Sequence, residues 1–173
     1  MQNIHNMINK YVSLYENKQK LENTKSSEVS VIFNETNLTE NRNVELKGFK
    51  NDHIGMLEFT LNEYKKIIES SIKELSLDEL ELLKSKITLD INKLQRELEI
   101  ADTSMHIYNK EIKDALLQNR FNMLEQHSNL IVEKYMLYSN TRTKLNTYLI
   151  FIDLIEIQIN EKIGIKTKTK KIS

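Results

Sequence analysis

The chain has 173 residues, with 25 basic and 25 acidic side chains, so its formal net charge at pH 7 is zero. This balance provides no large attractive field for nucleic acid. The absence of cysteine excludes disulfides, zinc–thiolate sites and thiol nucleophiles.

The chain also contains no proline and only three glycines. An average chain of this length would contain about nine prolines, at roughly 5% of residues. Proline is excluded from helix interiors, and loops recruit both proline and glycine, so their scarcity indicates few turns and long helices. An alternative explanation is the codon bias of an AT-rich genome, which the richness in Lys, Asn and Ile also suggests. We favour long helices and expect an all-α fold.

Residues 1–23 are predicted to form an amphipathic N-terminal helix, because apolar side chains recur at spacings of three and four. Residues 24–50 are rich in Ser, Thr and Asn and lack a sustained period, so we expect a mobile linker there. The apolar positions of the N-terminal helix are Ile4, Met7, Ile8, Tyr11, Leu14 and Tyr15.

A second helix is predicted from Asn51 to Leu75, the first element of a helical domain over residues 51–164. The next four residues, Ser76 to Glu79, match the capping box, in which the first and fourth residues satisfy each other's backbone N–H groups. We therefore expect a turn at Ser76 and a new helix after it. A continuous helix with Ser76 on its surface is the alternative.

From Ile87 the apolar residues follow a heptad repeat, with alternating steps of four and three. This first frame predicts one face of a coiled coil or of an elongated helical hairpin or bundle. Its members are Ile87, Ile91, Leu94, Leu98, Ala101, Met105, Tyr108, Ile112 and Ala115.

A second heptad frame opens at Leu117 and is shifted by two residues from the first. Polar residues interrupt it at Ser128, Arg142 and Glu156, and such residues at core positions fix register and partner choice at a cost in stability. Its apolar members are Phe121, Leu124, Ile131, Tyr135, Tyr138, Leu145, Leu149, Ile152, Ile159 and Ile163.

The frame shift has two explanations. One long helix can change its supercoil locally and bend, or the chain can turn between Gln118 and Asn122 and pack back as an antiparallel hairpin. We favour the bent helix, with a second possible corner at residues 139–141. Gly164 predicts the helix end, followed by a frayed basic tail over residues 165–173. The alternation of Ile with polar residues leaves a strand over 149–159 as an alternative.

No motif for catalysis, a cofactor or a metal is present. The four histidines belong to no His-Glu-x-x-His motif and form no pair four residues apart, so surface or half-buried positions are expected for them. The start of the chain lacks the charged and apolar regions of a secretory signal, and the apolar stretch at 148–159 is too short to span a bilayer. These observations predict a soluble, intracellular protein that is not an enzyme, in the nucleus or cytoplasm if eukaryotic.

The two apolar frames together are larger than the two shorter helices can cover, so we expect partner chains to bind them. The polar interruptions favour a hetero-oligomer over a simple homodimer. The chain is thus predicted to be a structural coiled-coil subunit that docks with partner helices in a multiprotein assembly. By architectural analogy alone, small subunits of kinetochore or vesicle-tethering complexes have this character. The alternatives are a bacterial or phage secretion-apparatus stalk or export chaperone built as an α-hairpin, and a compact four-helix regulator that binds a small ligand.

Any nucleic-acid contact is expected to be weak and confined to the tail lysines, which are Lys166, Lys168, Lys170 and Lys171.

Overall fold

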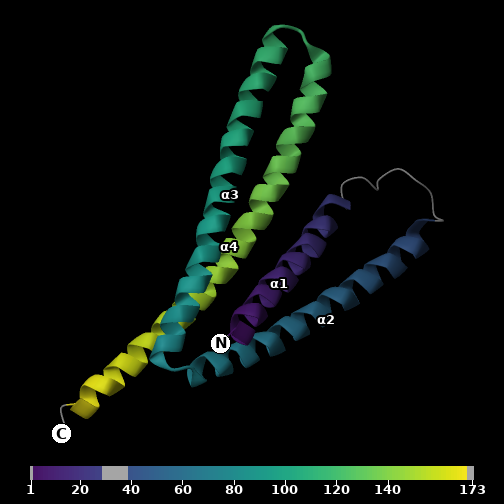
Figure 1. The fold of residues 1–173 in the computed structure, drawn as a ribbon. Coiled ribbons are helices and arrows are strands. Elements are labelled where there is room, and N and C mark those ends of the chain that lie inside the picture. The colour runs from purple at the N-terminus through teal and green to yellow at the C-terminus, as the bar shows by residue number, and fades with distance from the viewer. Residues whose placement is uncertain (1, 29–38, 171–173) are drawn as a thin grey trace. The chain divides into compact units, whose positions relative to one another are not determined.

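The computed structural model describes the backbone of residues 2–28 and 39–170, and the side chains of residues 3–22 and 52–164. These ranges contain the helices α1 (Gln2–Glu28), α2 (Thr39–Glu74), α3 (Leu77–Leu117) and α4 (Phe121–Lys170), and no strand (Figure 1). The prediction of an all-α fold built from long helices is confirmed.

The alternative of a strand over residues 149–159 is wrong, because α4 runs through this segment. The buried side chains there are Tyr148, Phe151 and Ile155, at spacings of three and four. This helical spacing places large apolar groups on one side of α4, and it outweighs the weak strand preference of the β-branched residues.

The chain divides into two compact units, which are described separately. Unit 1 combines Met1–Leu83 with Asp153–Ser173, and unit 2 is Lys84–Ile152. Both α3 and α4 therefore contribute to both units.

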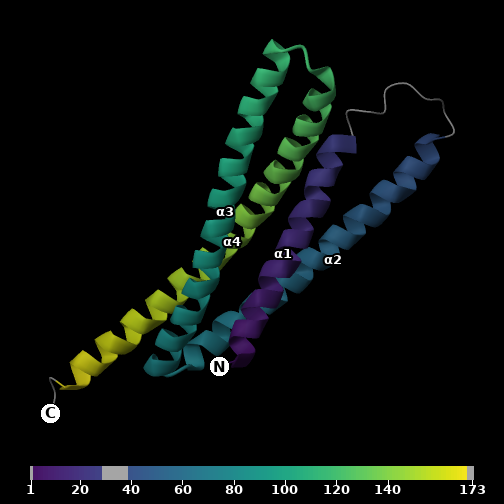
Figure 2. The same cartoon turned by 45° about the horizontal axis from the view of Figure 1, so that its top comes forward.

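In unit 1, α1 and α2 pack antiparallel. The Lys10 ammonium lies 5.2 Å from the centre of the Tyr64 ring, and Lys18 Nζ lies 3.0 Å from Glu58 Oε1. Later residues of α1 thus meet earlier residues of α2, and the two helices lie side by side where these contacts form (Figures 1 and 2). The buried apolar side chains of these two helices are Ile4, Ile8, Val12, Ile54, Leu61, Ile68 and Ile72.

The turn between α2 and α3 has the predicted capping box at Ser76. The Ser76 backbone N–H donates to Glu79 Oε2 at 2.9 Å, and the Glu79 backbone N–H donates to Ser76 Oγ at 3.4 Å. Hydrogen bonds from the Ser76 backbone and then from its hydroxyl lower the pKa of Glu79. A lowered carboxyl pKa means that this cap stabilises α3 at neutral pH and is lost as the pH falls through that lowered value.

The helices extend further into residues 24–50 than the expected linker allows. The helix α1 continues to Glu28, and α2 begins at Thr39, whereas residues 29–38 lie outside the described residues. Ser, Thr and Asn are only a few tenths of a kcal/mol less favourable in helices than the better formers. Adding residues to an existing helix is easy compared with starting a new one, so α1 and α2 lengthen through these polar segments.

Unit 2 is a hairpin of α3 and α4, which lie side by side in both views (Figures 1 and 2). The chain turns at residues 118–120, where Asn119 has a φ of 54°. The Arg120 N–H donates to the Ala115 carbonyl at 2.9 Å and the Asn119 N–H to the Leu116 carbonyl at 3.2 Å. These two bonds form a Schellman motif that closes α3. The bent continuous helix that we favoured from the sequence is therefore wrong, and the hairpin is correct.

The second corner expected at residues 139–141 is absent, because α4 continues through it. Thr143 Oγ1 donates to the Ser139 carbonyl at 3.1 Å and Thr147 Oγ1 to the Thr143 carbonyl at 2.9 Å, so the hydroxyls are satisfied within the helix. The helix also passes Gly164, where we expected its end, and runs to Lys170. A glycine inside a helix costs about 1 kcal/mol relative to alanine, and a helix as long as α4 can tolerate this cost. Residues 171–173 of the expected tail lie outside the described residues.

Asn119 should control the stability of the hairpin turn. Replacing it with valine, which tolerates positive φ poorly, should lower the free energy of unfolding by about 1–2 kcal/mol, whereas Asn119→Gly should leave it unchanged or raise it. Urea titration followed by circular dichroism measures both. Asn122→Val, in the first turn of α4, is the matched control and should change little. An equal loss in the Asn119 and Asn122 valine variants would contradict the assigned turn.

Candidate functional site

The first predicted frame lies on the packed side of α3. Ile87 and Ile91 are buried, together with Ala101 and Ala115. These four residues are buried in the folded single chain, without a partner chain. The remaining members are half-buried: Leu94, Leu98, Met105, Tyr108 and Ile112.

The second frame is correct at only one of its two core positions in each heptad. The second of these core positions was predicted at residues 128, 135, 142, 149 and 156. The packed side chains lie one residue before each of them. Five apolar members of the predicted frame are exposed, namely Leu117, Phe121, Tyr135, Leu149 and Ile163. The predicted members that are half-buried are Leu124, Ile131, Tyr138, Leu145, Ile152 and Ile159. The residues one position earlier that are buried or half-buried are His127, Lys134, Thr141, Tyr148 and Ile155.

The one-residue error in the frame of α4 was hard to see in the sequence, because polar residues occupy three of the five packed positions. Thr141 is buried, His127 packs its ring 6.1 Å from that of Tyr108, and Lys134 is half-buried. A lysine can cover apolar surface with its methylene chain while its ammonium reaches water. Tyr135 and Leu149 are more apolar than these groups, so the heptad pattern was assigned to the side of α4 that carries them, which is exposed. The apolar pair Tyr148 and Ile155 was the sequence signal that could have indicated the packed side of α4.

Exposed apolar side chains of unit 2 include two groups, one on α4 and one at the hairpin turn. The outer face of α4 comprises five side chains that are between 42% and 63% exposed, namely Val132, Tyr135, Met136, Leu149 and Ile150. The hairpin tip comprises four side chains that are between 40% and 83% exposed, namely Leu116, Leu117, Phe121 and Met123. Exposed large apolar side chains that gather on one surface are typical of interaction sites.

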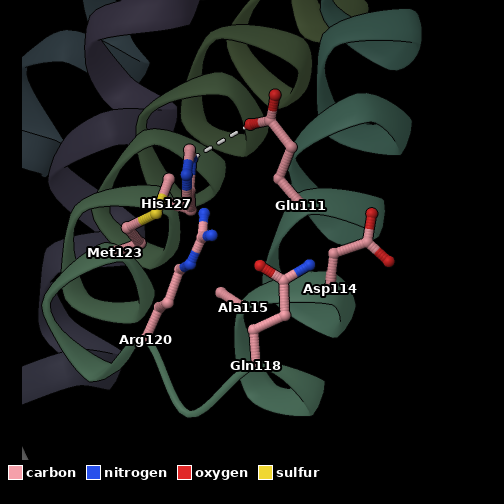
Figure 3. A pocket seen from close by; sticks show the side chains of 7 residues that line it. All are labelled: Glu111, Asp114, Ala115, Gln118, Arg120, Met123 and His127. Atoms are coloured by element: carbon pink, nitrogen blue, oxygen red, sulfur yellow. Dashed lines mark ion pairs between the residues drawn. The ribbon is translucent and has the colours of Figure 1, made fainter.

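A hollow of about 170 Å³ lies beside the tip, between the last turns of α3 and the first turns of α4 (Figure 3). His127 Nδ1 is 3.1 Å from Glu111 Oε2, and Figure 3 draws this contact with Asp114 and Arg120 nearby. The geometry of this contact is not that of a hydrogen bond. Both ring nitrogens of His127 are buried without a hydrogen-bond partner. The full set of lining residues is Glu111, Asp114, Ala115, Gln118, Arg120, Met123 and His127.

This hollow holds charges of both signs and opens to solvent through the exposed Gln118 and Arg120. Within residues 3–22 and 52–164, no group of three or more His, Asp or Glu side chains is placed to hold a metal ion. The contact between His127 and Glu111 joins α4 to α3 next to the turn. Its clearest role is to hold the two helices together at the tip.

Tyr148 is the group in unit 2 whose titration is most perturbed. Burial, and second the negative charge of Asp90 on α3, raise the pKa of Tyr148 from 10.0 to about 12. A raised pKa means that the folded chain keeps the phenol proton when the unfolded chain has lost it. Stability from this group is therefore complete below pH 10 and is lost as the pH rises toward 12.

We expect Tyr148→Phe to remove part of the alkaline loss of stability. Urea midpoints at about pH 8 and about pH 11 should differ less for the variant than for the unchanged chain, since phenylalanine does not ionise. The ultraviolet absorbance of tyrosinate, followed on the folded protein, checks the titration directly. Identical alkaline losses in both proteins would contradict a role for Tyr148.

None of the helices in the part of the chain that the structure describes is long and apolar enough to cross a membrane. Comparisons of the chain with protein-family models, with curated proteins and with solved structures found no match.

Proposed function

We propose that this chain is a non-enzymatic structural subunit of an intracellular multiprotein assembly, and that its α3–α4 hairpin docks onto helices of partner proteins. The observation that carries the proposal is the exposed hairpin tip, in which Leu117 and Phe121 flank the turn. Large apolar side chains at the end of a helical arm gain free energy when a partner covers them, at about 25 cal/mol per Å² of apolar surface. A hetero-oligomer is the form of assembly we favour.

The composition of the tip supports a protein partner. Three consecutive polar residues, Gln118, Asn119 and Arg120, separate Leu116 and Leu117 from Phe121 and Met123, and they can form the rim of an interface. Interfaces between proteins combine an apolar centre with such a rim. The stable Schellman turn at Asn119 presents these side chains on a fixed scaffold, so little conformational entropy is lost on binding.

Affinity capture with the full-length tagged chain tests this function. Partners identified by mass spectrometry and then purified should bind the unchanged chain, and Leu117→Glu or Phe121→Glu should weaken binding at least tenfold. Ile100→Glu, at an equally exposed apolar position on α3 away from the tip, is the control and should bind normally. Equal weakening by the tip and control variants, or partners that bind an unfolded tip variant equally well, would contradict the proposal.

The hairpin architecture also favours a second candidate, a bacterial or phage secretion-apparatus stalk or export chaperone built as an α-hairpin. A chaperone would bind one exported protein and release it, whereas a scaffold subunit would stay in a stable complex. The lifetime of the captured complex, measured by exchange with unlabelled chain, distinguishes them. Release within minutes in the presence of a secretion ATPase supports the chaperone, and a stable complex supports the scaffold.

A further inference from the structure

The outer face of α4 has a sequence pattern that is symmetric about its own middle. Taking a point between Arg142 and Thr143 as the centre, Tyr135 lies as far to one side as Ile150 lies to the other, and Met136 lies as far as Leu149. The residues between them on this face are polar, with Ser139 and Asn146 again at equal distances from the centre.

A face with this symmetry is complementary to a second copy of itself. In a two-fold antiparallel pair each residue meets its counterpart from across the centre. Tyr135 then meets Ile150, Met136 meets Leu149, and the Ser139 hydroxyl meets the Asn146 amide. Antiparallel helices also bring opposite ends of their dipoles together.

The exposed apolar area of the outer face of α4 is close to the apolar area that the smallest stable interfaces bury on each partner. Aliphatic side chains bury roughly 100 Å² and tyrosine roughly 200 Å², so the exposed parts of the five side chains of the outer face of α4 amount to roughly 330 Å². The smallest stable interfaces bury about 600 Å² per partner, of which about 57% is apolar, or roughly 340 Å².

We propose that two copies of this chain pair through the outer face of α4, antiparallel, with the two-fold axis between Arg142 and Thr143. This inference rests on the proposed function, in which the hairpin docks helices, and it assigns the outer face of α4 to a second copy while the hairpin tip stays available to a different protein. All the residues of the pairing belong to unit 2.

The pairing contains one unfavourable contact, and this contact gives the dimer a recognisable dependence on salt. Arg142 is exposed and lies beside the axis, so the two guanidinium groups of the pair approach each other. Salt screens such exposed charges over about 10 Å at 0.1 M. The dimer should therefore tighten as the salt concentration rises, and Arg142→Gln should tighten it further.

Sedimentation equilibrium on the purified full-length chain, from about 1 µM to about 500 µM, tests the pairing. We expect a monomer–dimer equilibrium in the micromolar range, weakened at least tenfold by Tyr135→Glu and strengthened by Arg142→Gln. Ile107→Glu, at an exposed apolar position of α3, is the control and should self-associate normally. A folded chain that stays monomeric throughout, or a Tyr135→Glu variant that dimerises normally, overturns the proposal.

Single cysteines test the antiparallel register, since the chain has none of its own. A short bismaleimide should join two copies of Thr143→Cys, whose positions face each other at the axis. It should not join two copies of Met136→Cys, which would lie roughly 20 Å apart at 1.5 Å per residue. Equal cross-linking of both variants indicates a parallel pair and overturns the proposed arrangement.

The two proposals fail independently. Loss of partner binding in Leu117→Glu with the dimer intact supports the tip function, whatever the outcome for the outer face of α4. A monomeric chain that still binds its partner through the tip overturns only the self-pairing.

Discussion

Phe151→Ala should lower the free energy of unfolding by about 3–5 kcal/mol, the range for removing a fully buried aromatic ring. Phe151 is 0% exposed and is the largest fully buried side chain among the residues that the structure describes. The cost has two parts, which are the lost transfer free energy of the ring and the cavity it leaves where neighbours cannot collapse. Urea titration followed by circular dichroism, at a protein concentration low enough to keep the chain monomeric, measures it.

Leu137→Ala is the matched control for this prediction. Leu137 is on the same helix, is exposed, and lies outside the outer face of α4. Its truncation should cost well under about 1 kcal/mol, because surface substitutions away from special features change stability little. If Phe151→Ala were as mild as the control, the packed side of α4 would have to be reassigned.

Ile68→Ala should cost about 2–5 kcal/mol, and its neighbour Ile67→Ala should cost well under about 1 kcal/mol. The two positions hold the same residue in the same helix, but Ile68 is 0% exposed whereas Ile67 is 50% exposed. Helix propensity changes identically in the two variants, so the difference between them reports burial in unit 1 alone.

Two measurements check this pair of variants. Urea titration gives the free energies of unfolding, and limited proteolysis reports whether α1 detaches when Ile68 is truncated. Faster cleavage of α1 is expected in Ile68→Ala, since Ile4, Ile8 and Val12 lose part of the buried surface they share with α2 in unit 1. Equal free energies for the two variants would show that α2 does not present this side to α1.

The helices themselves could be predicted because their signals are local. The periodic apolar residues of the helices and the capping box at Ser76 each depend on residues within a few turns of one another, and the capping box is confirmed. The fold class follows from the same periodicity and from the missing proline.

The hairpin turn could not be predicted as firmly, because its signal is a single residue. The turn needs one residue at positive φ, and the usual marker, glycine, is replaced by Asn119. Asparagine tolerates this conformation but also occurs often in this chain, so one more asparagine between two apolar stretches did not stand out. Asn119 lies four residues after Ala115, the last member of the first frame, so it was interpreted as a polar residue at a core position instead.

The packed side of α4 was misjudged for a different reason. This helix carries large apolar side chains on more than one side, so several heptad frames fit almost equally well. Which one packs is decided by α3, through contacts such as that of Tyr108 with His127 and the effect of Asp90 on Tyr148. Those contacts join residues far apart in the sequence, and periodicity within α4 carries no information about them. The exposed outer face of α4 follows from the same choice.

The Schellman turn at Asn119 also has a consequence for how unit 2 folds. Contacts beside the turn, such as Glu111 with His127, close loops of few residues, whereas contacts near Asp90 and Tyr148 close much longer ones. Loop-closure entropy increases with loop length, and local contacts form fastest. The hairpin is thus expected to nucleate at its tip and to form its remaining contacts progressively toward its open end. The residues of the hairpin tip would then be in place before the rest of unit 2 has folded.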